Sequence, residues 1–134
     1  PLFHSGGGLD LMLGTDAEAN PDRNAPVAGD LRVLITRRNG LVRALLMRPV
    51  SSTPGMPGHF ASSWRTNEFA SVEDISHLVE LQQRLVTDPH RVTVEVALPL
   101  SVLGLQPSPG MTILGDIGVL TGKDGRFHHR ATWH

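Results

Sequence analysis

Four oxygen-bearing side chains alternate along one loop in the pattern D-x-E-x-N-x-D: Asp16, Glu18, Asn20 and Asp22. Calcium prefers oxygen-rich loops of this kind, so the acids Asp16, Glu18 and Asp22 are candidate ligands of a structural calcium ion. Two positions depart from the calcium-loop pattern, because Pro21 stands where that pattern has glycine and Val27 where it has a bidentate acid. A solvated turn, capped by its own aspartate and asparagine side chains, is the alternative interpretation.

The remaining residues with reactive side chains show no catalytic spacing. The histidines include no H-E-x-x-H pattern, and His128 and His129 are adjacent, so on a strand they would point to opposite faces. The sequence contains neither G-x-S-x-G nor a G-K-[ST] phosphate loop. Asp116 and Glu95 are the acids well inside expected strands, and their neighbours suit the solvent face. We therefore expect no enzymatic activity.

Composition and charge exclude several classes of function. The chain has 134 residues, enough for a single domain over residues 1–134, and its net charge of −1 favours neither nucleic acid nor an anionic membrane as a partner. The absence of cysteine excludes disulfides and thiolate chemistry. No apolar run approaches the roughly 18 residues of a membrane span.

Arginine is concentrated on two adjacent segments, at positions 32, 37, 38, 43 and 48. We interpret this cluster as the solvated outer face of a sheet, with contact to an anion or a carboxylate as the alternative.

One stretch of the chain indicates how the elements are arranged. Apolar and polar residues alternate from Val92 to Leu98, the period of a half-buried strand, and Pro99 ends it. Residues 100–104 have the spacing of one helical turn that ends in glycine. Residues 107–110 then reverse the chain, and 111–120 form a second expected strand.

Further strands are expected at residues 9–14, 30–38 and 41–48, within 60–72, and at 126–134. Asn39-Gly40 predicts a tight hairpin, because both residues tolerate positive φ. Residues 71–88 fit either a helix or a strand, and their β neighbours favour strand. About eight short strands with turn signals between them predict an all-β fold. We expect an antiparallel two-sheet β-sandwich, jelly-roll-like, with at most one or two short helical turns.

Taken in order, six segments of the chain resemble the family 9 carbohydrate-binding modules and similar β-sandwich domains of secreted bacterial proteins. They are LDLMLGTD at 9–16, the hairpin at 27–50, FASSWRT at 60–66, the stretches 92–110 and 113–125, and RATWH at 130–134. The resemblance covers most of the chain. It implies a non-catalytic module of a larger secreted or periplasmic protein that docks saccharides.

The resemblance also assigns a candidate saccharide site. Pyranose rings pack on aromatic faces while polar side chains bind the hydroxyls, so Trp64 and Trp133 are the candidate stacking residues. Arg65, Arg130 and His134 are the candidate hydrogen-bonding residues. Aromatic content is only 4%, which favours the alternative that both tryptophans are core residues. The protein would then be a structural or protein-interaction module that has lost sugar binding.

The chain departs from the resembled domains at its beginning. Such domains start with a further strand before the segment that matches residues 9–16, so we expect this chain to be an N-terminally incomplete fragment. A missing strand would leave a sheet edge that must be covered or paired. We therefore expect a homodimer, or a strand supplied by another chain, to complete that edge.

Overall fold

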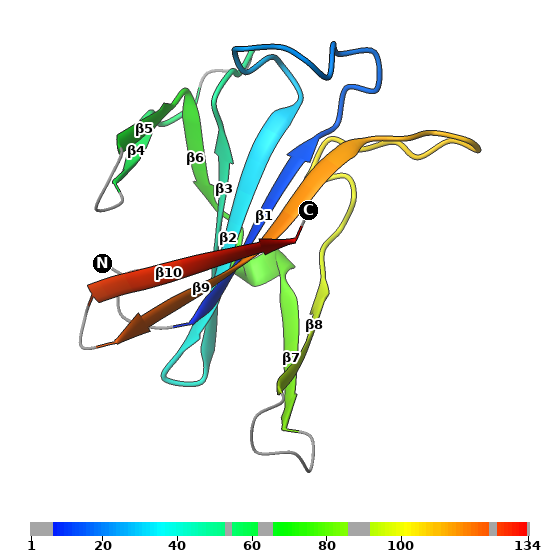
Figure 1. Ribbon diagram of the computed structural model, residues 1–134. Coiled ribbons are helices and arrows are strands. Elements are labelled where there is room, and N and C mark those ends of the chain that lie inside the picture. Colours follow the sequence, from blue (N-terminus) through cyan, green and yellow to red (C-terminus); the bar gives the residue numbers. More distant parts are fainter. Residues whose placement is uncertain (1–6, 53–54, 62–65, 86–91, 124–125, 134) are drawn as a thin grey trace.

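The computed structural model describes residues 7–52, 55–61, 66–85, 92–123 and 126–133 (Figure 1). These residues form ten strands and one short 3₁₀ turn. The elements are β1 (Gly8–Gly14), β2 (Asp30–Arg38), β3 (Leu41–Arg48), β4 (Gly58–Ala61), β5 (Thr66–Phe69), β6 (Ser71–Asp74), η1 (Ser76–Leu78), β7 (Glu80–Leu85), β8 (Val92–Ala97), β9 (Leu114–Lys123) and β10 (Arg126–Trp133). Within this part of the chain no helix is long and apolar enough to cross a membrane.

Six of the strands form one antiparallel sheet in the order β10-β9-β1-β2-β3-β6. The other four form two-stranded ribbons, β4–β5 and β7–β8, and Figure 1 shows the β7–β8 ribbon extending away from the six-stranded sheet. All pairings are antiparallel, so the all-β antiparallel prediction is confirmed. The two-sheet, jelly-roll-like arrangement stays a prediction.

The first strand lies inside this sheet and not at its edge. In β1, Leu11 lies opposite Val33 of β2 on one side and opposite Ile117 of β9 on the other. The β2–β3 hairpin turns at Asn39 and Gly40 with φ of 52° and 79°, as the Asn-Gly signal predicts. The chain thus brings residues from its beginning and its end onto neighbouring strands.

Both faces of the sheet are covered around β2. One face carries a core of buried residues from β2, β3 and the segments that follow: Leu31, Val33, Ile35, Ala44, Leu46, Ile75, Val79 and Leu103. The opposite face has a smaller core of Leu34, Met47, Phe69 and Leu120. Residues 31–36 of β2 are therefore all buried, and this strand has no wet face over that range.

The strand-turn-strand stretch after residue 91 is split between two sheets. β8 pairs with β7, whereas β9 joins the large sheet and begins at Leu114 instead of Met111. The helical turn between them is confirmed: Leu103 donates its N–H to the carbonyl of Leu100, and Gly104 ends the turn with φ of 71°.

The structure also decides between helix and strand for the described part of residues 71–88. The strand interpretation is confirmed for β6 and β7, and the turn η1 lies between them. Ser76 fixes this turn, because its hydroxyl oxygen accepts the N–H of Ala44 on β3 at 2.9 Å.

Candidate functional site

A cavity of about 790 Å³ opens beside the smaller core, where β1, β2, β5 and β9 meet the loop 15–29. Apolar side chains of Met12, Phe69 and Leu114 form part of its wall. Its polar lining consists of Arg23, Asp30, Arg32, Asn67, Glu68 and Asp116. Apolar walls with a few converging polar groups are characteristic of small-molecule sites.

The loop 15–29 is held in a defined shape that brings Arg23 to this cavity. At its base, Thr15 donates both its N–H and its hydroxyl to the carbonyl of Gly29, whose φ is 95°. Farther along, Arg23 bonds the carboxylate of Asp30 and the carbonyl of Asn20. A long loop with such internal bonds can form a fixed wall of a binding site.

The acids predicted to bind calcium take part in turns of this loop. Asp16 Oδ1 accepts the N–H of Glu18 at 3.0 Å, and Asn20 Oδ1 accepts the N–H of Asp22 at 2.9 Å. Among the described residues, no three His, Cys, Asp or Glu side chains are gathered so that they could hold a metal ion. The side chains of Asp16 and Asn20 thus cap turns of this loop, and calcium binding at Asp16, Glu18 and Asp22 stays a prediction.

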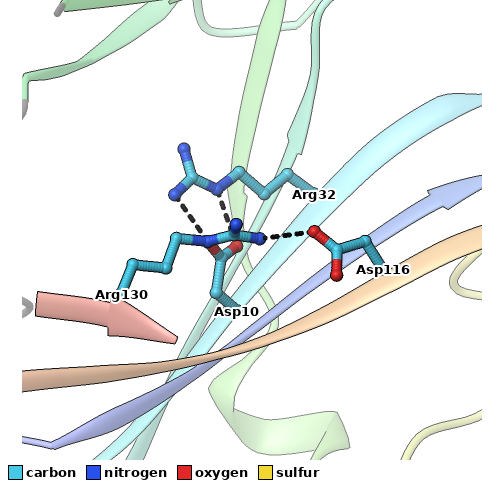
Figure 2. A network of polar contacts seen from close by, with 4 residues as sticks. All are labelled: Asp10, Arg32, Asp116 and Arg130. Atoms are coloured by element: carbon cyan, nitrogen blue, oxygen red, sulfur yellow. Dashed lines mark hydrogen bonds and ion pairs between the residues drawn. The ribbon is translucent and has the colours of Figure 1, made fainter. Parts of the chain in front are cut away.

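An ion-pair network spans four neighbouring strands next to the cavity (Figure 2). Asp10 of β1 is completely buried and accepts two bonds from Arg32 of β2, from Nε at 2.7 Å and from Nη2 at 2.8 Å. Arg130 of β10 donates from Nε to Asp10 Oδ2 at 2.6 Å. Its Nη2 donates to Asp116 Oδ2 of β9 at 3.0 Å. Two positive and two negative groups thus balance each other.

These contacts compensate the cost of burying charge. A carboxylate removed from water is stable only when it is paired and hydrogen-bonded, and Asp10 accepts three charge-assisted bonds. Burial alone would lower the pKa of the Arg130 guanidinium. Its hydrogen bonds to Asp10 and Asp116 outweigh that effect and raise the pKa above the ordinary arginine value.

Asp116 is only partly satisfied by this network. Its Oδ2 is bonded to Arg130, whereas its Oδ1 is buried and has no hydrogen-bond partner among the described residues. The side chain is 31% exposed and lines the cavity. A buried acceptor without a donor is costly, so this carboxylate is the group in the site that most needs a further partner.

A glycine makes the position of Arg130 possible. Gly118 of β9 lies between Asp10 and Thr132 in the sheet, and a Cβ built on it would lie 2.8 Å from Arg130 Nε. Any side chain at this position would occupy the space of the guanidinium.

The structure describes only part of the predicted saccharide site. Arg130 is a member of the ion-pair network. The backbone of Trp133 ends β10 opposite Ile117, while its side chain lies outside the described part of the structure. Trp64, Arg65 and His134 also lie outside the described residues. Whether the two tryptophans share a site therefore stays a prediction.

Two sequence-based assignments are wrong. Asp116 was expected on the solvent face, but one of its oxygens is buried and the other is ion-paired. For Arg32 the preferred interpretation, a solvated face, is wrong, and the alternative, contact to a carboxylate, is confirmed: Arg32 is 8% exposed and paired with Asp10. The signal that was overlooked is the presence of opposite charges on strands that lie side by side. That signal can be read only once the order and register of the strands are known.

No protein family, curated protein or solved structure matches this chain.

Proposed function

We propose that this chain is a non-catalytic carbohydrate-binding module of a larger secreted or periplasmic protein, folded as a jelly-roll-like β-sandwich. The observation that supports it best is the cavity, which combines apolar walls with arginine, aspartate and asparagine side chains. Saccharides need this combination, because their C–H faces pack on apolar surfaces while their hydroxyls take directed hydrogen bonds.

The polar groups of the cavity are fixed before any ligand arrives. Arg32 is held by two bonds to Asp10, and Arg23 is held by Asp30 and the carbonyl of Asn20. Groups that are already ordered lose little conformational entropy on binding, which favours affinity for a small, polar ligand.

The tryptophans retain their proposed role as stacking surfaces. Trp64 shortly precedes Asn67 and Glu68 in sequence, and both of those residues line the cavity. Trp133 shortly follows Arg130, whose guanidinium holds Asp116. In this proposal Arg65, Arg130 and His134 supply polar contacts, directly or by holding a neighbouring group in place.

Isothermal titration against a broad panel of mono- and oligosaccharides tests the proposal. We expect heat from at least one sugar, with affinity lowered about tenfold or more by Trp64→Ala, as for loss of a stacking aromatic. Met56→Ala, at an exposed position away from the cavity, is the matched control and should bind like the parent. No heat from any sugar with folded protein would refute the proposal.

The second candidate is a structural or protein-interaction module whose partner is another copy of this chain. Ile117 and Val119 of β9 are 55% and 46% exposed, next to β10 at the edge of the described sheet. Exposed apolar residues near a sheet edge favour association. Sedimentation at micromolar concentration would show a dimer that Val119→Lys dissociates, and a clean monomer would exclude it.

Tryptophan fluorescence distinguishes the two candidates. Emission typical of solvent-exposed tryptophan, quenched by a soluble quencher, supports stacking surfaces for a sugar. Blue-shifted emission that is not quenched supports tryptophans packed in the core.

A further inference from the structure

We propose that the cavity takes an uncharged, hydroxyl-bearing group of its ligand and that the carboxylate of Asp116 accepts a hydrogen bond from that hydroxyl. This inference rests on the proposed carbohydrate-binding function and names the chemical group recognised. It is carried by the unpartnered oxygen of Asp116 and by the balance of charge around it.

Asp116 requires a donor from outside the described chain. Its Oδ2 has one bond, to Arg130, and its Oδ1 has none. An ionised carboxylate is an acceptor only, with room for about four hydrogen bonds. The torsion about its last side-chain bond is broad, and the side chain is 31% exposed where it lines the cavity, so a partial turn of the carboxylate brings Oδ1 within reach of a ligand there. A ligand that satisfies this carboxylate must therefore donate a proton.

The neighbouring charges decide which kind of donor fits. Arg130 already neutralises Asp116, and Arg32 neutralises Asp10. A ligand ammonium bonded to Asp116 would lie close to the Arg130 guanidinium, and like charges at such separations repel. A neutral hydroxyl meets the same need without that repulsion.

Anionic ligands are disfavoured for a related reason. The cavity's arginines, Arg23 and Arg32, are each bonded to an aspartate, Asp30 and Asp10 respectively. A ligand carboxylate beside Asp116 would place two negative charges side by side, and it could not donate the hydrogen bond that Asp116 lacks. The lining therefore distinguishes a neutral sugar from a sugar acid by electrostatics.

The experiment compares the parent and Asp116 variants with a matched trio of ligands, built on a sugar that binds: the neutral form, its uronic acid and its amino sugar. Titration calorimetry should give the tightest binding for the neutral form. That affinity should change less than about twofold between low and high salt, because no net charge is neutralised on binding.

A set of monodeoxy sugars tests the contact itself. Removal of one particular hydroxyl should weaken binding to the parent about tenfold or more, as expected for a hydrogen bond to a charged group. Asp116→Ala should bind this deoxy sugar as tightly as it binds the parent sugar, because the carboxylate that the hydroxyl contacts is already absent. The hydroxyl and the carboxylate thus form a double-mutant cycle of binding free energies. Asp116→Asn, which keeps an acceptor oxygen, provides a second variant should Asp116→Ala fold poorly. Glu95→Gln, at an exposed position on the β7–β8 ribbon and outside the cavity lining, should keep the full deoxy penalty.

The outcomes separate this inference from the proposed function. Sugar binding without any deoxy position coupled to Asp116, or tighter and salt-dependent binding of the uronic acid or the amino sugar, would overturn the inference while the carbohydrate-binding function stands. If no saccharide binds the folded protein, both the inference about Asp116 and the carbohydrate-binding function are wrong.

Discussion

Arg130 on the last strand donates from Nε to Oδ2 of Asp10 on the first strand, at 2.6 Å, and the two residues are 120 positions apart in sequence. β9 lies between their strands and contributes Gly118, opposite Asp10, where any side chain would occupy the space of the guanidinium. The bond therefore joins the first and the last strand of the described chain across β9. It also positions the Arg130 guanidinium, which in turn bonds Asp116 in the wall of the cavity.

Asp10→Asn should destabilise the protein by about 3–5 kcal/mol, because it leaves two arginines without the carboxylate that compensates their burial. Urea unfolding followed by circular dichroism measures the change. Asp22→Asn, at an exposed position in the loop 15–29, is the control and should stay within about 0.5 kcal/mol of the parent. Equal stability of the two variants would contradict the ion-pair network.

Gly118→Ala should cost about 1–3 kcal/mol, because its Cβ would lie 2.8 Å from Arg130 Nε and force the guanidinium away from Asp10. The cost should fall in an Arg130→Ala background, where that contact no longer exists, and a double-mutant cycle of unfolding free energies measures the coupling. Gly7→Ala is the control, since its nearest neighbour atom would be 3.7 Å away. Additive effects of the two substitutions would show that the glycine serves another purpose.

Local patterns predicted the fold class, because strands and turns follow from nearby residues. The alternation in β8, the Asn39-Gly40 hairpin and the turn that ends at Gly104 were read from a few positions each. The ion-pair network could not be read in this way. Asp10 and Arg32 look like solvent-facing residues of their own strands, and only the pairing of β1 with β2 makes them neighbours. The order β10-β9-β1 in turn brings Arg130 to Asp10.

The candidate site shows the same limit. The loop 15–29 was predicted to carry function through its acids, as candidate calcium ligands, but it is Arg23 of that loop that lines the cavity. Asp116 could not be distinguished from Glu95 by sequence alone, since both are single acids in alternating strands. What separates them is Arg130, which reaches Asp116 from the neighbouring strand, whereas Glu95 lies exposed on the β7–β8 ribbon.

Removal of calcium should leave the protein's stability unchanged. Asp16 and Asn20 cap turns with their side chains, and the acids of this loop are not gathered around a metal-sized space. Thermal melting in excess calcium and in EDTA should therefore give midpoints within about 1 °C, because only a ligand that binds the folded state raises them. A midpoint that rises with calcium, and no longer does so with Asp16→Ala, would establish the calcium site instead.

Asp74 should make stability depend on pH in the acid range. Hydrogen bonds from the Ser76 hydroxyl and backbone N–H lower the pKa of Asp74 below its ordinary value. A folded-state pKa below the unfolded one adds stability that is present above about pH 4 and is lost as pH falls through the folded value. Asp74→Asn should flatten that decline in urea unfolding between about pH 5 and 2, by less than about 1 kcal/mol because the group is near the surface. Glu95→Gln is the matched control, and a decline unchanged by Asp74→Asn would contradict the assignment.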